Sequence, residues 1–341
     1  MHMAAARLQA SGTTSEAPVI IGQHPLIEQI DRVIRKVAVT DSTVLILGES
    51  GTGKDLVARS IHAQSPRCGA SFVPVNCGAI PGELLESEMF GHERGAFTGA
   101  AVPRAGLLQM AHEGTIFLDE VGEMSSHLQV KLLRVLQDGV VRPVGSDRTI
   151  TVDVRVVAAS NKDLAAEVLA GRFREDLYYR LNVIPLTMPA LRERRSDVPH
   201  LVRHFLGLHN RRRHGQPLSV SDQAMVQLWE YDWPGNVREL ENLMERLAVL
   251  ADGPVIGVDD LPPAIRAIAT PRPANRPTVA GEGFDLQAAV EEFEQGIIAE
   301  AMRRTNGNKQ AAARLLGVKR TTLVAKLRRR GQAAPDAGIP A

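Results

Sequence analysis

Residues 48–55 carry glycines and a lysine in a spacing that suits phosphate binding. The segment follows a short apolar run at 43–47, which predicts a buried strand, and precedes a helical pattern from Leu56 to Ala63. Glycines let backbone N–H groups close around phosphate oxygens, and a helix N-terminus adds positive potential. This context favours a P-loop over a chance glycine turn. The candidate nucleotide-binding residues are Gly48, Glu49, Ser50, Gly51, Thr52, Gly53, Lys54 and Asp55.

Lys54 fits the general phosphate-binding motif, whereas Asp55 departs from it. We expect the Lys54 ammonium to reach the β- and γ-phosphates of the nucleotide. Asp55 stands where the general motif has Ser or Thr, so the hydroxyl that usually binds magnesium is missing.

A second apolar run, Thr115 to Leu118, leads into the carboxylates of Asp119 and Glu120. At a strand end beside a P-loop, Asp119 is placed to hold magnesium, directly or through water. Glu120 is placed to orient and polarise the attacking water. The alternative is a polar strand end that caps the next helix. A P-loop without an acidic partner strand would be incomplete, so we favour the catalytic interpretation, with ATP and magnesium as cofactors.

Three further polar residues are candidates for the same chemistry. Asn161 follows a third apolar run and is a candidate sensor of the γ-phosphate or of water, although such a residue alone is more often part of a turn. Arg174 and Arg180 flank acidic residues, and they are either surface charges paired with Glu175 and Asp176 or arginine fingers for a neighbouring subunit.

The hexapeptide at residues 95–100 contains one aromatic residue and one hydroxyl residue between glycines and alanines. Its composition offers too little apolar mass to build a core, and it suits a mobile loop that presents Phe97 and Thr98 to another molecule. An ordinary glycine hinge is the alternative for such a segment in isolation. Its residues are Gly95, Ala96, Phe97, Thr98, Gly99 and Ala100.

The elements around these motifs predict an α/β fold. From residue 19 to about 186, apolar runs alternate with helical stretches, as expected for a parallel sheet with crossover helices. One amphipathic helix is expected at 126–137. The strand pattern is lost from 187 to 266, which predicts a helical lid.

Arg238 lies within the predicted lid. Asn236 and Glu239 resemble a capping box, which places Arg238 in the first turn of a helix. Arg238 is either a solvated charge or a nucleotide sensor. A cation in that turn opposes the helix dipole, which favours the sensor.

The remaining segments predict a separate C-terminal domain. Residues 1–18 are expected to form a flexible tail and 267–283 a linker. The unit 284–341 begins with an amphipathic helix and continues as two helices joined by a turn at Gly317. Residues 301–330 contain many Lys and Arg but no Asp or Glu, which indicates an anionic partner.

Composition excludes several protein classes. The chain has 341 residues, a net charge of +1 and two cysteines, Cys68 and Cys77, which indicate neither a disulfide framework nor a metal site. No apolar run is long enough to span a bilayer, and the first residues lack the centre of a signal peptide. We therefore expect a cytoplasmic protein.

Together these motifs resemble the AAA+ ATPase domain of bacterial enhancer-binding proteins, which activate RNA polymerase carrying sigma-54. The family has an acid at the position of Asp55, so this departure from the general P-loop supports the resemblance. The resemblance covers about residues 19–266 and rests on the P-loop, the 95–100 hexapeptide and the stretches 75–77, 88–93, 114–120, 173–182 and 233–240.

The resemblance implies roles for the candidate residues. Asn76 restrains the catalytic Glu until the loop engages its target, Arg238 is the second sensor, and Phe97 with Thr98 grips sigma-54. The catalytic candidates are Lys54, Asn76, Asp119, Glu120, Asn161, Arg174 and Arg180.

The C-terminal unit resembles the Fis-type helix-turn-helix that ends most members of this family. Its second helix would enter the major groove, with base and phosphate contacts left open. A solvated basic helix pair is the alternative. A weaker resemblance points to the flagellar regulators within the family. The DNA-binding candidates are Lys319, Arg320, Thr321, Thr322 and Lys326.

The function implied is ATP-driven activation of sigma-54 RNA polymerase from upstream DNA, by a ring that is a hexamer by analogy. A DNA-bound co-regulator without remodelling activity and an AAA+ machine of another kind are the alternatives. Two departures from the family pattern concern moving parts: Leu108-Gln109 replaces Phe-Glu, and Pro143 replaces an Arg in a second pore loop.

Overall fold

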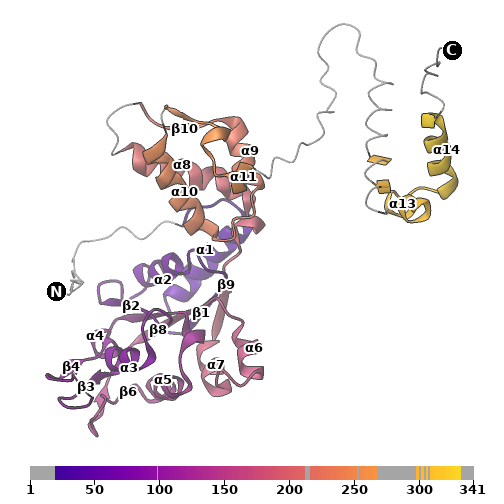
Figure 1. The fold of residues 1–341 in the computed structure, drawn as a ribbon. Helices are drawn as coiled ribbons and strands as arrows, with labels where there is room; N and C mark the ends of the chain where they lie inside the picture. Colours follow the sequence, from indigo (N-terminus) through magenta and orange to yellow (C-terminus); the bar gives the residue numbers. More distant parts are fainter. Residues whose placement is uncertain are drawn as a thin grey trace, which may run out of the picture. The chain divides into compact units, whose positions relative to one another are not determined.

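The chain forms two compact units, Met1–Ile268 and Ala269–Ala341, and each is described by itself (Figure 1). The structure, a computed structural model, describes residues 20–97, 99–211, 216–251, 253–266, 297–298, 301–302, 305 and 308–331. The predicted N-terminal tail 1–18, the whole predicted linker 267–283 and the start of the C-terminal unit lie outside these residues.

A five-stranded parallel sheet organises the first unit, in the order β2-β5-β8-β1-β9. Since parallel strands share one carboxyl edge, the P-loop after β1 is brought next to the residues that end β5 and β8. This arrangement confirms the predicted α/β class. The strands are β1 (Val44–Leu47), β2 (Phe72–Asn76), β5 (Thr115–Asp119), β8 (Arg155–Ser160) and β9 (Ile184–Thr187).

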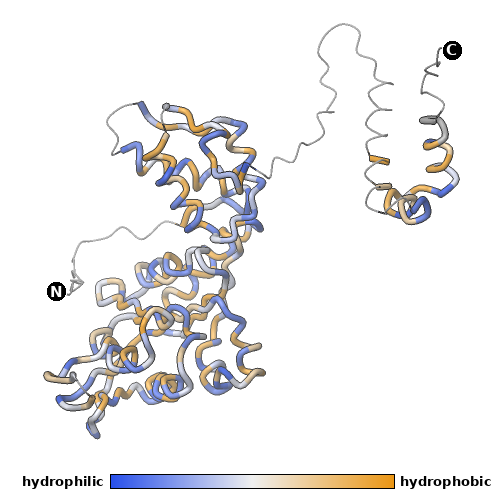
Figure 2. Tube along the Cα trace, viewed as in Figure 1, coloured by the Kyte–Doolittle hydropathy of each residue, from blue (hydrophilic) through white to orange (hydrophobic). Residues whose placement is uncertain are grey.

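Helices cover both faces of the sheet because successive strand residues point to opposite sides. Val44 and Ile46 pack with one group of helices, while Leu45 packs with the other. Figure 2 shows hydrophobic and hydrophilic residues alternating along these helices. The first group is α1 (Pro25–Ala38) and α2 (Lys54–Ala63), and the second is α3 (Gly82–Phe90), α4 (Leu107–Met110), α5 (Ser126–Asp138), α6 (Leu164–Leu169) and α7 (Glu175–Leu181).

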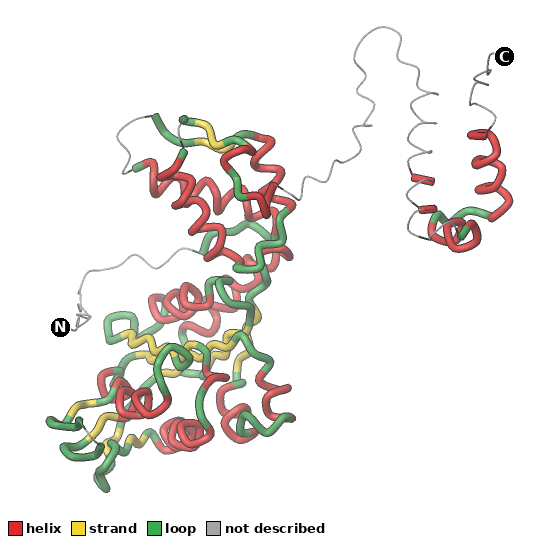
Figure 3. Tube along the Cα trace, in the orientation of Figure 1, coloured by secondary structure: helices red, strands yellow, loops and turns green. Residues whose placement is uncertain are grey.

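The lid packs around Trp233, whose side chain is fully buried and whose indole N–H donates to the Leu228 carbonyl at 2.8 Å. The lid is not purely helical as predicted, because a short parallel strand pair, β10–β11, joins two of its loops (Figure 3). Its elements are η2 (Leu191–Glu193), η3 (Arg195–Asp197), α8 (Val198–Asn210), β10 (Ser219–Val220), α9 (Asp222–Glu230), α10 (Asn236–Leu250), β11 (Val255–Ile256), η4 (Val258–Asp260) and α11 (Pro263–Arg266).

Two small hairpins and one 3-10 turn complete this unit. The first hairpin carries the 95–100 hexapeptide, and a bridge between His92 and Val144 connects it to the second. Figure 1 shows these hairpins at the end of the unit opposite the lid. The elements are β3 (Gly91–His92), β4 (Arg104–Ala105), η1 (Val121–Glu123), β6 (Val140–Val141) and β7 (Ile150–Thr151).

The second unit contains α13 (Lys309–Leu315) and α14 (Arg320–Gly331). The Asn308 side chain caps α13 by accepting from the N–H groups of Gln310 and Ala311. Gly317 has φ 65°, a left-handed conformation that glycine adopts without strain, and it forms the predicted turn. Leu323 packs on the small residues of α13 in a buried cluster.

Candidate nucleotide site and partner-binding surfaces

The P-loop forms the floor of a cavity of about 440 Å³ between the sheet and the lid. Lys54 is the first residue of α2, and its ammonium donates to the carbonyls of Gly48 at 2.7 Å and Glu49 at 3.0 Å. Burial lowers the pKa of Lys54, and the nearby carboxylates of Asp119 and Glu120 oppose that shift. A lysine held by carbonyls in this way can transfer its hydrogen bonds to phosphate oxygens.

The acidic strand end lies beside this lysine. Burial raises the pKa of Asp119, Lys54 lowers it, and Glu120 raises it again. Glu120 has φ 56°, which is uncommon for a residue with a side chain and often marks a functional position. The structure therefore brings Lys54, Asp119 and Glu120 together at one cavity.

Asn76 contacts Glu120 only indirectly. Its amide oxygen accepts from the N–H groups of Gly78 and Ala79, both at 2.9 Å. The resulting turn carries Gly78 against the Glu120 carboxylate, and a Cβ on Gly78 would lie 2.4 Å from Oε2. Asn76 thus shapes the backbone next to Glu120 in this conformation.

The first residues of α10, in the lid, form hydrogen bonds with the P-loop. The Asn236 amide donates to the Ser50 carbonyl at 3.0 Å and to the Glu49 carboxylate at 3.1 Å, and its oxygen accepts from the Leu191 N–H. The backbone N–H groups of Val237 and Arg238 donate to the Gly51 carbonyl.

The predicted capping box at Asn236 is therefore wrong. Asn236 is the first helical residue, with φ 52°, and the residue at the N-cap is Gly235. The Glu239 carboxylate still accepts from the N–H of Gly235 at 2.8 Å, so only the acidic half of the box is present. The P-loop carbonyl of Gly51 takes the place of the capping side chain.

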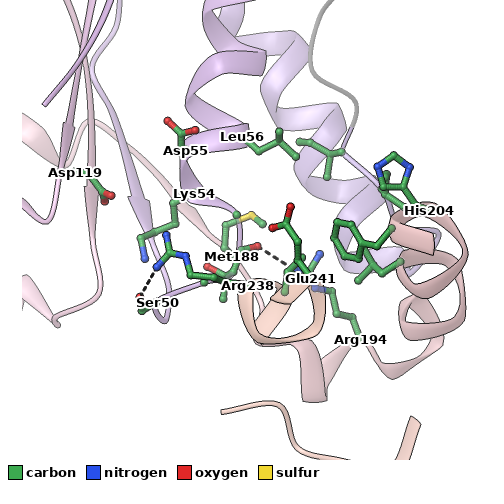
Figure 4. A pocket seen from close by; sticks show the side chains of 18 of the residues that line it. Ser50, Lys54, Asp55, Leu56, Asp119, Met188, Arg194, His204, Arg238 and Glu241 are labelled. Atoms are coloured by element: carbon green, nitrogen blue, oxygen red, sulfur yellow. Dashed lines mark hydrogen bonds between the residues drawn. The ribbon is translucent and has the colours of Figure 1, made fainter. Parts of the chain in front are cut away.

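Arg238 lies in the first turn of α10 as predicted, and it lines the cavity. Its guanidinium donates to the Ser50 hydroxyl at 3.5 Å, and Figure 4 shows it beside Lys54. A second arginine, Arg192, forms a two-pronged ion pair with Glu49, which with the Asn236 hydrogen bond lowers the pKa of Glu49 to about 2.

Two buried charged residues of the lid escaped the sequence analysis. Arg194 is 2% exposed and donates to the Thr52 carbonyl at 3.0 Å. Asp197 is fully buried, and its Oδ1 accepts from the N–H groups of Gln23 and His24. In the sequence they sit among other charges, and nothing local distinguishes them from surface residues.

The apolar side of the cavity was also missed. Here the lid and the first described residues enclose space next to the polar floor, in a cavity whose size is typical of ligand sites. The apolar lining consists of Ile20, Ile21, Leu56, Met188, Leu201, Phe205, Leu208 and Val237.

Three of the predicted catalytic residues do not line this cavity, and neither do Gly48 and Glu49 of the P-loop. Asn161 is exposed beyond the end of β8. Arg174 pairs with Asp176 at 2.7 Å, and Arg180 donates to the Leu136 carbonyl at 2.8 Å. Within one subunit, both arginines are thus satisfied locally.

The residues fit a nucleotide with magnesium. Burial raises the pKa of Asp119 most, and the charges of Glu120 and Asp55 raise it too, while Lys54 opposes them. The carboxylates of Asp55, Asp119 and Glu120 all line this edge of the cavity. Mg²⁺ is usually held by one or two carboxylates together with water and phosphate oxygens. Among the described residues, no group of three or more His, Cys, Asp or Glu could hold a metal ion alone. Asp119 therefore suits a cation that is shared with phosphate.

The hexapeptide is displayed at the tip of its hairpin. The Phe97 residue is 43% exposed, and Gly95, Ala96 and Gly99 are at least partly exposed, whereas Ala100 is buried. Thr98 lies outside the described residues.

The five DNA-binding candidates are all exposed. They occupy the turn before α14 and that helix itself, in which Leu323 is buried against α13. Such an arrangement suits a recognition helix.

Three family models match consecutive parts of the chain. The sigma-54 interaction domain matches residues 20–187, the AAA+ ATPase lid domain matches 192–278, and the Fis family of bacterial regulatory proteins matches 289–329. The transcriptional regulatory protein ZraR of Escherichia coli (strain K12) is 49% identical over 310 residues, which are 91% of this chain and 68% of ZraR. The chain belongs to the sigma-54-dependent transcriptional activators.

Further relatives support this membership. The regulatory protein AtoC of Escherichia coli (strain K12) is 44% identical over 323 residues, covering 95% of this chain and 70% of AtoC. The crystal structure of NtrX from Brucella abortus in complex with ATP is similar with a TM-score of 0.67 and 36% identity, covering 92% of this chain and 69% of NtrX.

For this activator, the predicted family, the AAA+ fold and the Fis-type DNA-binding unit are confirmed. Its partners are sigma-54 RNA polymerase and DNA. The flagellar branch and the cytoplasmic location stay predictions. None of the described helices is both long enough and apolar enough to cross a membrane.

Proposed function

We propose that this activator hydrolyses ATP in the P-loop cavity and uses the reaction to remodel sigma-54 RNA polymerase from a closed into an open complex. The observation that carries the proposal is that Lys54, the Asp119–Glu120 strand end and Arg238 line one cavity.

Each residue has a role that follows from its position. Lys54 exchanges its two carbonyl contacts for phosphate oxygens. Glu120 orients the attacking water, and Asp119 holds magnesium. Magnesium, when bound, neutralises charge on the phosphates.

The lid can respond to the nucleotide because it already holds the P-loop. Arg238, Asn236 and Arg192 all contact residues 49–51. Phosphate binding changes the same backbone, so it also changes the platform on which α10 rests.

We place Arg174 and Arg180 in the nucleotide site of the next subunit. Arg174 directly precedes α7 and Arg180 lies on it, and both are exposed and outside their own cavity. To act there, Arg174 must leave Asp176 and Arg180 must leave the Leu136 carbonyl. This role requires a ring, which we propose is a hexamer.

The hexapeptide contacts sigma-54, with Phe97 as the aromatic anchor and Thr98 beside it. The hairpin lies at the end opposite the lid, so partner contact and hydrolysis use separate residues (Figure 1). The C-terminal unit binds upstream DNA through α14 and concentrates the ATPase near the promoter.

Transcription in vitro from a sigma-54 promoter, measured beside ATP hydrolysis, tests this function. Phe97→Ala and Thr98→Ala should keep hydrolysis within a few-fold of normal and lose open complexes, because neither residue belongs to the phosphate motifs. Val249→Ala is a control, since Val249 is 77% exposed but lies on the lid. If both loop variants still activate transcription, the loop is structural and the proposal fails.

The co-regulator alternative predicts a different result. A protein that only binds DNA would give no open complexes even unaltered, and it would not be retained on sigma-54 with a transition-state analogue of ATP. Retention that needs the analogue and Phe97 would support remodelling.

A further inference from the structure

His92 contacts three different parts of the hexapeptide hairpin. Its Nδ1 lies 2.7 Å from the Ser87 hydroxyl, and its Nε2 lies 3.0 Å from the Val102 carbonyl oxygen. Its ring meets the Phe97 ring edge to face, with 5.1 Å between centroids and 64° between planes. One half-buried side chain thus joins α3, the outgoing arm of the loop and the aromatic residue at the tip.

The chemistry of the contacts fixes the tautomer of a neutral His92 ring. A carbonyl oxygen only accepts hydrogen bonds, so Nε2 must carry the hydrogen and donate to Val102. Nδ1 then accepts from the Ser87 hydroxyl. Ser87 is 5% exposed on the helix that packs Met89 and Phe90 into the core, so the ring is oriented by a rigid element.

The hairpin base does not depend on the imidazole. Val144 N–H donates to the Gly91 carbonyl at 2.8 Å, and Glu93 N–H donates to the Val144 carbonyl at 3.0 Å. These backbone bonds, with the Gly91–Ala105 pairing, remain when the side chain of His92 is changed. The ring is needed instead for the arm beyond the base, where Val102 is 69% exposed.

We propose that His92 is a positioning residue for the sigma-54 contact: it holds Phe97 by its ring and ties the outgoing arm of the loop to α3 through Ser87 and Val102. The inference rests on the proposed role of Phe97. In this proposal a side chain outside the hexapeptide holds the loop in its binding conformation before sigma-54 is bound. A loop positioned in advance loses less conformational entropy when it binds its partner.

Graded substitutions separate the hydrogen bonds of His92 from its ring contact. His92→Ala removes the hydrogen bonds with Ser87 and Val102 and the contact with the Phe97 ring. His92→Gln keeps an amide donor for the Val102 carbonyl but has no ring. His127→Ala is the matched control, because the His127 side chain is 67% exposed and pairs with Glu86 away from the loop.

The readout is retention of sigma-54 by the whole 341-residue chain with a transition-state analogue of ATP, beside ATP hydrolysis. His92→Ala should weaken retention about tenfold, as expected from losing one or two hydrogen bonds and an aromatic contact, with hydrolysis unchanged. His92→Gln should recover part of the loss, and His127→Ala should equal the unaltered protein.

Phe97→Ala distinguishes failure of this inference from failure of the proposed function. If Phe97→Ala loses retention but His92→Ala keeps it, the positioning role is wrong and the loop contact stands. If Phe97→Ala keeps retention, both are wrong.

Amide hydrogen exchange tests the same inference without sigma-54. The loop is closed by the bonds Gly95 N–H to the Ala100 carbonyl, 2.8 Å, and Ala100 N–H to the Phe97 carbonyl, 3.0 Å. His92→Ala should accelerate exchange at these amides and leave β2 and β5 protected. Equal exchange in the variant and the unaltered protein would overturn the proposal, and faster exchange throughout the sheet would show a folding defect instead of positioning.

Discussion

The backbone of Gly78 lies against the Glu120 carboxylate and leaves no room for a Cβ atom on residue 78. A Cβ on residue 78 would stand 2.4 Å from Oε2 of Glu120 and 3.3 Å from Cγ of Glu123. Gly78 therefore defines where the carboxylate rests, and it is placed there by the turn around Asn76.

Gly78→Ala should reduce ATP hydrolysis with little effect on ATP affinity, because the added methyl displaces Glu120 and leaves the P-loop intact. Misplacement of a catalytic group by about 1 Å can cost roughly 10²-fold. Gly82→Ala is the control, since a Cβ there meets nothing within 4 Å. Steady-state hydrolysis and nucleotide titration would measure both effects, and normal turnover in the Gly78 variant would show that Glu120 adapts.

Lys54→Ala and Glu120→Gln should fail at different steps. The first removes the ammonium that contacts phosphate, so nucleotide binding should be lost. The second keeps the side-chain shape but cannot polarise water, so ATP should stay bound and turnover should stop. Equilibrium binding beside hydrolysis checks this, and near-normal hydrolysis by the Glu120 variant would contradict its assignment.

Arg174→Ala subunits mixed with Glu120→Gln subunits should recover part of the hydrolysis that each lacks alone. A site with an intact arginine from one subunit and an intact acid from another can form only in mixed rings. Arginine fingers contribute roughly 10³–10⁵ in rate, so even a few such sites are measurable. No recovery at any ratio, in rings shown to co-assemble, would argue against action between subunits.

Asn236→Gly should destabilise the lid and weaken nucleotide binding. Glycine keeps the left-handed backbone but removes the donors to Ser50 and Glu49, and it leaves the buried Leu191 N–H unpaired, at a cost of about 1–3 kcal/mol. Asn242→Ala, on an exposed position of the same helix, is the control. Urea unfolding and nucleotide titration are the measurements, and equal behaviour of both variants would refute this role of the Asn236 hydrogen bonds.

Removal of the C-terminal unit after Arg266 should keep ATP hydrolysis and abolish binding to upstream DNA. In the full chain, binding should weaken steeply with salt, since each neutralised phosphate contributes roughly −0.9 to the slope of log affinity against log salt. Lys319→Ala should reduce this slope by about one if it contacts phosphate. Tight, salt-insensitive DNA binding by the shortened protein would contradict the assignment.

The sequence predicted those parts of the site that lie at the end of one strand or the start of one helix. Lys54 follows glycines at a helix start, and Asp119 with Glu120 ends a buried strand, so the sequence order nearly determines their positions. The parallel sheet then brings these strand ends together, which is why the cavity floor was predictable.

Residues that act across long sequence separations were not predictable in the same way. Asn236 has the composition and spacing of a capping box, but its amide binds Ser50, 186 positions away. Arg194 and Asp197 look like surface charges until the lid folds over the P-loop. Asn161 was expected in the site and is exposed, because strand-end position alone does not fix where a side chain points.

Asp197 of the lid binds the segment that precedes α1. Its Oδ1 accepts from the backbone N–H of Gln23 at 2.7 Å and from that of His24 at 2.9 Å. The described residues just ahead of α1 are therefore attached to the lid. A module fused ahead of Ile20 would pull on the lid through this attachment. Movement of a light-sensitive or ligand-sensitive module fused at that junction would therefore move the lid, which forms one wall of the nucleotide cavity.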